Sequence, residues 1–290
     1  MADLAVFEEQ RSRMWGVAYR LTGSVMDADD AVQDAWLRWQ SLPNGEATHP
    51  RGYLTTVVSR ICYDQLGSAR ARRESYVGPW LPEPVVAEIG PEAYVILDES
   101  VGLAMLAVLE RLTPAERTAF VLHDVFAVPF PEIADIVGKS PEAARKLASR
   151  ARKRVRAQTP LRSPDRGEHR RVVEAFLAAA TEGDLQALLK VLDPGVVWRS
   201  DGGGKVIAAR IPVVGPEKVA HFARRLARGF DAATMSVAVR DVNGAPGLVF
   251  VDPAGGRMAV LGFTVYRGRL TAIDLIVNSD KLSHLDPGRI

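Results

Sequence analysis

The chain has 290 residues, of which 47% are hydrophobic and 25% are charged, so it is globular and long enough for two or three domains. Its formal net charge is only +2, which excludes a protein that coats nucleic acid uniformly. Any binding to nucleic acid must therefore come from positive charge on particular elements. The one cysteine, Cys62, excludes an intramolecular disulfide framework and fits a reducing cytosol.

The first ten residues, MADLAVFEEQ, are acidic and lack the apolar core of a signal peptide. The longest apolar run, Val101–Leu109, is too short to span a bilayer. We therefore expect a soluble protein of the cytoplasm. Cys62 and the scattered histidines show no ligand spacing, so neither a metal site nor a cofactor is predicted.

Residues 4–75 predict helices throughout. The segment Asp27–Gln40 begins with acids, which favour a helix N-terminus, and then spaces apolar residues for burial. Its exposed face carries three aspartates: Asp27, Asp30 and Asp34. For Trp36 and Trp39, the spacing favours the core over an interface.

A second helix is predicted over Arg51–Leu66, and a basic turn follows at Arg70–Arg73. An acidic helix and a basic helix in one small domain suggest two partners. One face could bind a protein while the other binds nucleic acid.

The segment Pro79–Pro84, with three prolines in six residues, favours an extended conformation and resists helix formation. A looser acidic stretch follows it, so this region is predicted to be a linker. Trp80 and Leu81 are unusual in a linker, and we expect them to dock on another surface.

The stretch Pro131–Arg156 predicts a helix-turn-helix. A short apolar helix ends at Gly138, and Ser140 and Pro141 suit the start of the next helix. The second helix of such a motif enters the major groove of DNA N-terminus first. It continues here into a block of basic residues, which can neutralise phosphates. A solvated basic helix face is the alternative interpretation, which the capped turn makes less favourable.

The last third predicts helices at 169–184 and 185–192, followed by short β-branched segments separated by Gly or Pro turns. Strands are predicted at 196–200, 205–211, 234–242, 247–252, 257–268 and 269–277. An amphipathic helix at Pro216–Phe230 interrupts them. Helices followed by a curled antiparallel sheet indicate an α+β domain.

The sequence Asp201–Lys205, DGGGK, follows the first of these strands. Three successive glycines permit a tight backbone path and close approach of another surface, although a simple hairpin turn is an equal alternative. Its spacing does not fit a phosphate-binding loop.

Two segments near the N-terminus resemble the second domain of extracytoplasmic-function (ECF) sigma factors. DADDAVQDAWLRW is similar to the helix that binds bacterial RNA polymerase, and PRGYLTTVVSRICYDQLGSARARR to the segment that melts and recognises the −10 promoter element. The resemblance implies polymerase contacts at Asp27, Asp30, Asp34 and Trp36. It implies contacts with −10 DNA at Asn44, His49, Tyr53, Thr56, Arg60, Arg72 and Arg73. For Tyr53, ordinary core packing is an equal alternative.

The stretch Leu109–Val155, which contains a capping box at Thr113–Glu116, is similar to the fourth domain of these factors. That domain recognises the −35 element. The resemblance implies DNA contacts at Glu142, Ala143, Arg145, Lys146, Ser149, Arg150 and Arg152. Arginine suits this role because its planar fork can pair with both acceptors of a guanine edge.

The C-terminal third resembles the SnoaL-like fold, a cone-shaped barrel whose central pocket suits apolar ligands. Three segments of this chain resemble segments of sigma factors that have this extension: Trp80–Pro84, Asp201–Lys205 and Asn278–Leu282. The last segment differs in having Ser279 where proline is usual. The resemblance implies regulatory contacts at Trp80, Leu81, Pro82, Asp201, Gly202, Gly203, Gly204, Lys205, Asn278, Asp280, Lys281 and Leu282.

The expected architecture is therefore multidomain, with two all-α sigma domains followed by an α+β SnoaL-like domain. The boundaries are sigma domain 2 at 1–78, a Pro-rich linker at 79–97, sigma domain 4 at 98–157, a linker at 158–166 and the SnoaL-like regulatory domain with its C-terminal tail at 167–290.

We expect a non-enzymatic sigma factor that is regulated in cis by its C-terminal domain. Its expected partners are core RNA polymerase and promoter DNA, without a membrane, and a small apolar ligand is left open. The chain is expected to be a monomer. One alternative is a SnoaL-like enzyme fused to a helix-turn-helix, in which His221, Asp201 and Asp274 would be available without a spacing that identifies acid and base. The other is a ligand-responsive DNA-binding regulator, against which the acidic helix argues.

Overall fold

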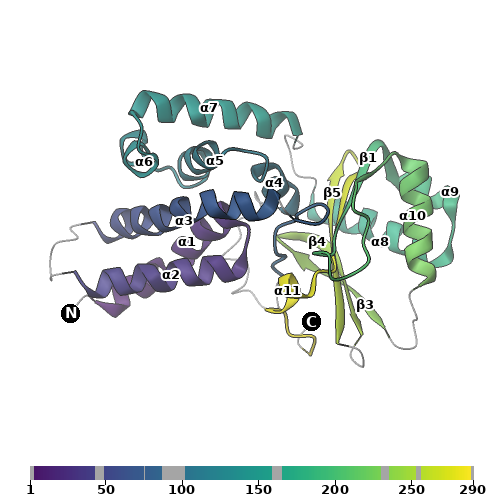
Figure 1. Ribbon diagram of the computed structural model, residues 1–290. Coiled ribbons are helices and arrows are strands. Elements are labelled where there is room, and N and C mark those ends of the chain that lie inside the picture. The colour runs from purple at the N-terminus through teal and green to yellow at the C-terminus, as the bar shows by residue number, and fades with distance from the viewer. Residues whose placement is uncertain are drawn as a thin grey trace. The chain divides into compact units, whose positions relative to one another are not determined.

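The computed structural model describes residues 3–42, 49–74, 76–86, 102–158, 165–229, 235–252 and 256–288. It divides into two compact units, Met1–Ser75 with Leu106–Thr159 and Tyr76–Met105 with Pro160–Ile290 (Figure 1). Residues 76–86, which include the start of the predicted linker, thus group with the C-terminal domain. The domain boundaries stay predictions, because residues 87–101 and 159–164 lie outside the described part.

The helical unit begins with three helices that pack against one another: α1 (Leu4–Thr22), α2 (Val25–Gln40) and α3 (Pro50–Glu74). Gly23, at φ 71°, ends α1, and Ser24 caps α2 by accepting a hydrogen bond from the Asp27 N–H at 3.1 Å. Burial raises the pKa of the Cys62 thiol in α3 to about 12, so this thiol is a packing residue.

The same unit continues with α4 (Leu103–Leu109), α5 (Pro114–Phe120), the π-helix η2 (Val121–Val125), α6 (Phe130–Val137) and α7 (Pro141–Gln158). The first three residues of α4 belong to the other unit. Thr113 and Glu116 form the predicted capping box. Gly138 ends α6 at φ 65°, and α5 and α6 both pack against α7. The predicted helix-turn-helix is therefore present.

Two arginines connect the first three helices to the later ones within this unit. Arg117 is 2% exposed and donates through Nε to the Arg20 carbonyl at 3.1 Å. The Arg13 guanidinium donates to the Phe126 carbonyl at 2.9 Å and lies over the Phe126 ring.

The C-terminal unit has two helices, α8 (Arg166–Glu182) and α9 (Leu185–Val191), before a six-stranded sheet of order β2-β1-β6-β5-β4-β3. The strands are β1 (Leu192–Asp201), β2 (Val213–Val214), β3 (Ser236–Val242), β4 (Ala245–Asp252), β5 (Arg257–Tyr266) and β6 (Arg269–Ile276). Helix α10 (Pro216–Arg228) follows β2, and α11 (Ser279–Leu282) follows β6. This confirms the predicted fold class as far as architecture goes, an all-α part followed by an α+β domain.

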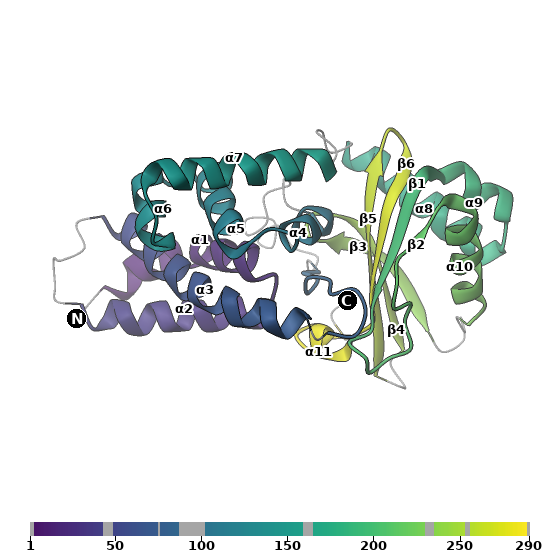
Figure 2. The same ribbon diagram turned by 45° about the horizontal axis from the view of Figure 1, so that its top comes forward.

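Helices α8, α9 and α10 lie on one face of this sheet (Figures 1 and 2). Because side chains alternate along a strand, Leu248 of β4 packs toward these helices while Val249 packs on the opposite face. The opposite face is covered by Leu81, Leu103 and Leu282. The linker segment and the C-terminal tail therefore complete a second, smaller core.

Two sequence predictions for the sheet were wrong. Residues 205–211 form an irregular loop, because Gly203 and Gly204 turn the backbone at φ 61° and 74° and the chain does not pair until Val213. The sheet is not purely antiparallel, since β1 pairs with β6 in parallel, with Trp198 opposite Ile273. The long excursion through β2 to β5 between these two strands makes the parallel pairing feasible.

Among the described residues, no helix is long and apolar enough to cross a membrane. Within the same ranges, no group of three or more His, Cys, Asp or Glu residues is placed to hold a metal ion.

Candidate functional site

The predicted polymerase-binding surface lies on α2. Asp30 and Asp34 are exposed, whereas Asp27 is half-buried at the start of the helix. Trp36 is half-buried, with its ring in edge contact with Phe7 at 4.8 Å between centroids. Trp39 is 5% exposed and donates to the Asp3 carbonyl, as expected of a core residue.

Sequence reasoning missed two apolar members of this surface. Met26 and Leu37 are 57% and 56% exposed. Residues 26, 30, 34 and 37 are spaced by four, four and three, so they share one face of α2. The predicted contacts were three acids and Trp36, whereas the face of α2 combines charge with exposed aliphatic area, as protein interfaces do.

The predicted −10 residues fall on α3 or next to it. His49, Tyr53, Thr56 and Arg60 are spaced by four, three and four residues and therefore share a face. His49 and Arg60 are exposed, whereas Tyr53 is half-buried with its ring 6.0 Å from that of Trp39. Asn44 lies outside the described residues. Arg72 and Arg73 belong to the last turn of α3, where only the backbone is described.

The predicted −35 residues lie on α7. A stripe of small or apolar residues faces the domain core, and it comprises Ala144, Ala148, Ala151 and Val155. The opposite side exposes Glu142, Arg145, Lys146, Ser149 and Arg150, while Ala143 is half-buried. The Ser140 hydroxyl accepts from the Ala143 N–H at 3.2 Å and caps the helix.

Two basic side chains of α7 form ion pairs with other helices of the same unit. Arg152 pairs with Asp124 at 2.7 Å and Arg154 with Glu116 at 2.7 Å. These two pairs fasten α7 to the preceding helices, so the positive charge of Arg152 is partly neutralised. The predicted role of Arg152 in DNA contact remains a prediction, and Arg150 is the more exposed of the two.

The predicted regulatory residues meet around one buried carboxylate, that of Asp201 at the end of β1. Asp201 is 0% exposed and accepts from the Leu81 N–H at 2.8 Å and from the Tyr76 hydroxyl at 2.5 Å. The Lys281 ammonium lies 2.8 Å from the same carboxylate and also donates to the Leu81 carbonyl. Its Nζ stands 3.7 Å from the centre of the Trp80 ring. We call these five residues the Asp201 cluster.

Two family models match the chain, Sigma-70 region 2 over residues 6–72 and Sigma-70 region 4 over residues 102–155. The ECF RNA polymerase sigma factor SigJ of Mycobacterium tuberculosis (strain ATCC 25618 / H37Rv) is 44% identical over 292 residues, covering 97% of this chain and 93% of SigJ. The chain belongs to the ECF RNA polymerase sigma factors.

The likeness extends beyond the helical domains. A crystal structure of M. tuberculosis SigJ matches with a TM-score of 0.79 and 40% identity, over 97% of this chain and 98% of that chain. The probable ECF sigma factor SigI of M. tuberculosis (strain CDC 1551 / Oshkosh) is 36% identical, over 98% of this chain and 95% of its own length. As an ECF sigma factor, this chain acts with core RNA polymerase in transcription initiation at promoter DNA.

In this sigma factor the Gly-rich loop is shaped by its contact with the C-terminal tail. A side chain at Gly203 would overlap the Asn278 amide, and one at Gly202 would overlap the Val206 carbonyl. The Gly203 N–H donates to Asp201 at 3.1 Å, and Asn278 donates through Nδ2 to the Tyr76 hydroxyl at 2.8 Å. Burial and the hydrogen bond to Asp201 raise the pKa of Tyr76 above its ordinary value, which keeps the phenol a donor.

Other members of the predicted regulatory set surround the Asp201 cluster. Leu282 packs in the same small core as Leu81, and Pro82 is buried beside it in the sequence. Lys205 and Asp280 form an exposed pair at 2.7 Å, with side chains 57% and 64% exposed. Exposed pairs of this kind contribute little to stability.

Three further contacts of the docked segment have little signal in the sequence. Tyr76 binds Asp201 and Asn278, as described. Asn243 exchanges hydrogen bonds with Val85, its N–H donating to the Val85 carbonyl at 2.8 Å and its Oδ1 accepting from the Val85 N–H at 3.1 Å. The His284 ring lies 2.9 Å from the Pro84 carbonyl. Asn243 has φ 53°, a conformation that Asn tolerates in the tight turn between β3 and β4.

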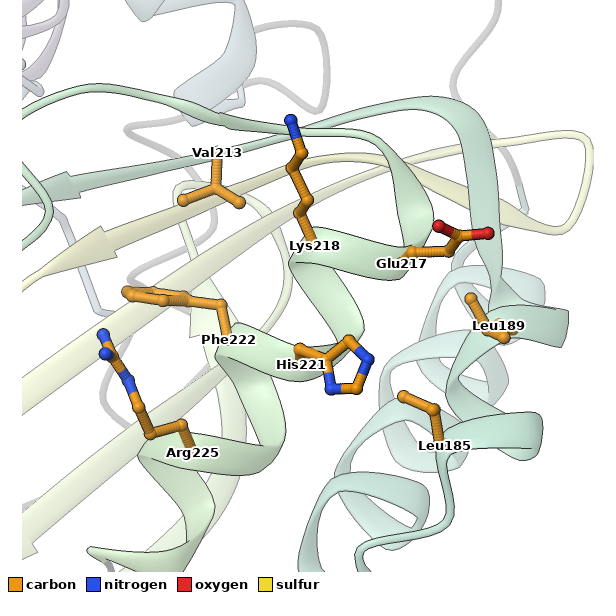
Figure 3. A pocket seen from close by; sticks show the side chains of 8 residues that line it. All are labelled: Leu185, Leu189, Val213, Glu217, Lys218, His221, Phe222 and Arg225. Carbon is orange, nitrogen blue, oxygen red and sulfur yellow. The ribbon is translucent and has the colours of Figure 1, made fainter.

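The three residues considered for catalysis are not brought together. His221 faces an open groove between α9 and α10, across from Leu185 and Leu189 (Figure 3). Asp274 pairs with Arg199 at 2.5 and 2.7 Å on the face of the sheet opposite Trp198. Asp201 belongs to the cluster that holds Leu81. The geometry thus does not assemble an acid and base pair from these residues.

Proposed function

We propose that the C-terminal domain of this sigma factor controls the connection between the two promoter-recognising domains by holding residues 76–86. The observation that carries this proposal is the Asp201 cluster. One buried carboxylate binds the Leu81 N–H, and its partner Lys281 binds the Leu81 carbonyl. Asp201 and Lys281 thus recognise the backbone of the connecting segment as an additional strand would.

The charges in the Asp201 cluster make the docking specific. Removing one member of a buried ion pair leaves the other without compensation and costs about 3–5 kcal/mol. Because the segment and the domain belong to one chain, docking is intramolecular, with an effective concentration that reaches about the millimolar range for short flexible linkers. We propose that the sigma factor acts as a monomer, in the cytoplasm with its polymerase.

The promoter and polymerase contacts are part of the same proposal. The acidic and apolar face of α2 binds core polymerase, the face of α3 with Tyr53 and Arg60 binds melted −10 DNA, and α7 enters the −35 major groove. Support comes from the shared helical faces and from the exposure of Asp30, Asp34, Arg60 and Arg150. The exposed side chains of α7 that would contact bases and phosphates begin at the capped N-terminus of the helix, as in other helix-turn-helix proteins.

Docking limits how far the connection can extend. An extended chain spans about 3.3–3.6 Å per residue, so holding residues 76–86 shortens the freely variable connection by roughly 35–40 Å. A free connection adapts to length changes at low cost, about 0.6 kcal/mol for each doubling of loop length. Docking should therefore narrow the range of spacings between the −10 and −35 elements that the sigma factor accepts.

The test is run-off transcription with core polymerase, on a promoter first selected from host genomic DNA with the wild-type holoenzyme. The spacing between its two elements is then varied by one to three base pairs. Lys281→Met removes the buried charge, and Lys205→Met removes an exposed one as the matched control. At non-optimal spacings we expect Lys281→Met to retain about threefold more of its optimal activity than the wild type. The Lys205→Met variant should follow the wild type.

Tyr76→Phe removes one hydrogen bond to Asp201 without removing a charge, and serves as a second variant if Lys281→Met folds poorly by circular dichroism. Identical spacing profiles for the wild type and for folded Lys281→Met and Tyr76→Phe proteins would refute control by docking.

A further inference from the structure

One aromatic side chain, that of Phe130, contacts both α7 and the π-helix η2. Phe130 is the first residue of α6, which packs against α7 (Figure 1). The Arg145 guanidinium of α7 lies over the Phe130 ring, 5.3 Å from its centre. The His123 ring of η2 stacks on the same Phe130 ring, with 4.1 Å between centroids and 15° between planes. Phe130 therefore lies in contact with a basic side chain from the exposed side of α7 and with a ring that fixes its own orientation.

The backbone before α6 holds the His123 ring in this place. His123 belongs to a π-helix, and π-helical turns are rare and are frequent at functional sites. The Ala127 N–H donates to the His123 carbonyl at 3.1 Å, and the Val128 N–H donates to the Leu122 carbonyl at 2.9 Å. Ala127 has φ 56°, which costs free energy for a residue with a Cβ and persists only where the surroundings impose it. The chain thus accepts backbone strain at the turn that sets His123 against Phe130.

Arg145 differs from other basic side chains of α7 in what it contacts. Lys146 pairs with Glu142 at 2.7 Å, and Arg152 and Arg154 pair with carboxylates of other helices. Within the described ranges, Arg145 has no carboxylate at ion-pair distance and contacts the Phe130 ring instead. An aromatic face attracts a cation without neutralising it. The charge of Arg145 therefore remains available to a ligand outside the protein.

A guanidinium needs a fixed orientation to recognise a base. It pairs with both acceptors on the major-groove edge of guanine through two hydrogen bonds in one plane, so a rotating guanidinium loses part of this geometry. A free arginine side chain also loses rotamer entropy when DNA fixes it. A ring that already holds the guanidinium reduces this entropic cost of binding.

We infer that Phe130 is a positioning residue for Arg145, and that it thereby sets how strongly the sigma factor discriminates for guanine at one position of the −35 element. The inference rests on the DNA contact of α7 proposed above, and it adds the residue that orients this contact. Phe130 acts through Arg145 alone. A Phe130 that only packed α6 in place would instead affect the affinity for all −35 sequences together.

The orientation of Arg145 is measured first, in the full-length protein without DNA, by nuclear magnetic relaxation of the arginine Nε–H groups. Arg150, which is exposed on the same helix, is the internal control. We expect the Arg145 group to be more ordered than the Arg150 group in the wild type and in Phe130→Tyr, which keeps the ring. Phe130→Leu removes the ring but keeps apolar volume, and it should lower the order of Arg145 to that of Arg150. Equal order of the two groups in the wild type would overturn the positioning role.

Recognition is then measured by binding of the holoenzyme to the promoter selected with the wild-type protein, with each position of the −35 element changed in turn. We expect Arg145→Met to lose about tenfold in discrimination at one G·C pair. Phe130→Leu should lose about threefold at the same pair only, while Phe130→Tyr should follow the wild type. In an Arg145→Met background, Phe130→Leu should have no further effect at this pair.

Phe130→Met is a second variant without the ring, in case Phe130→Leu folds poorly by circular dichroism. Unchanged discrimination in folded variants without the ring, or an equal loss of affinity for all −35 sequences, would overturn the inference. A loss in Phe130→Tyr as large as that in Phe130→Leu would also overturn it. In each of these cases, loss of discrimination in Arg145→Met would preserve the proposed DNA contact.

The Arg145→Met variant tests the proposed contact separately. A uniform loss of affinity would assign Arg145 to a phosphate and overturn its role in discrimination, together with that of Phe130. Wild-type affinity and discrimination in Arg145→Met would mean that the proposed contact at this residue fails, while the relaxation result for the free protein would stand.

Discussion

At the scale of single residues, Asp201 and Lys281 hold the backbone of the connecting segment. Both are buried, and both bind the backbone of Leu81. A buried ion pair is weak evidence for stability, because desolvation offsets much of the attraction. Its value here is specificity, since an apolar pair could pack against Leu81 but could not fix the position of its N–H and carbonyl.

A second buried group makes the C-terminal domain sensitive to acid. His169 on α8 is 6% exposed, and burial lowers the pKa of its imidazole to about 4. The ordinary pKa is about 6.5, so the folded state favours the neutral ring. Its contribution is therefore fully present above about pH 6.5 and is lost as the pH falls toward about 4.

We expect the free energy of unfolding of the C-terminal domain to decrease by roughly 3 kcal/mol from His169 alone between these two pH values. Urea unfolding followed by tryptophan fluorescence across this range measures it. His169→Gln keeps a polar side chain that does not titrate, so its stability should vary less with pH. The same variation with pH in both proteins would show that another group is responsible.

At the scale of elements, α2 is the clearest case of a surface built from two kinds of side chain. Its acids suit long-range attraction to a basic partner, and its exposed Met26 and Leu37 supply apolar area. Interface affinity is concentrated in few residues, so the apolar pair should matter as much as the charges.

We expect Leu37→Ala and Met26→Ala each to weaken binding to core polymerase by about fivefold to tenfold, the loss of about 1–1.4 kcal/mol. Leu4→Ala is the matched control, because Leu4 is 55% exposed on α1 and lies outside this face. Fluorescence anisotropy of labelled protein titrated with core enzyme gives the affinities. If the Leu37→Ala and Met26→Ala affinities matched that of Leu4→Ala, the α2 face would not be the docking surface.

The sequence predicted elements best where local chemistry decides them. Thr113 with Glu116 and Gly138 with Ser140 mark helix ends by local hydrogen bonds or backbone conformation, and the structure confirms these ends. The strand predicted at 205–211 failed because β-branched composition indicates propensity but not the presence of a pairing partner. Parallel pairing of β1 with β6 is a tertiary property that no local pattern contains.

The residues of the candidate sites also divide into those that local sequence patterns predict and those that depend on tertiary contacts. Aspartates on one helical face and the Gly-rich loop were visible in the sequence. Tyr76, Asn243 and His284 were not, because their role depends on contacts across 125 to 202 positions of sequence. Exposure of Met26 and Leu37 likewise depends on how α2 packs against α1 and α3.

At the scale of the whole molecule, the chain combines promoter recognition with a domain that holds its own connecting segment. Tethering makes a separate regulatory protein unnecessary for this contact, because the effective concentration is set by the chain itself.

The most direct test is amide hydrogen exchange of residues 76–86 in the full-length protein, measured by mass spectrometry for the wild type, Lys281→Met and Lys205→Met. In the wild type and in Lys205→Met we expect Leu81 and Val85 to exchange at least about a hundredfold more slowly than unstructured amides. Lys281→Met should lose most of this protection while α1 to α3 stay protected. Unprotected exchange of this segment in the wild type would contradict docking of the connection on the C-terminal domain.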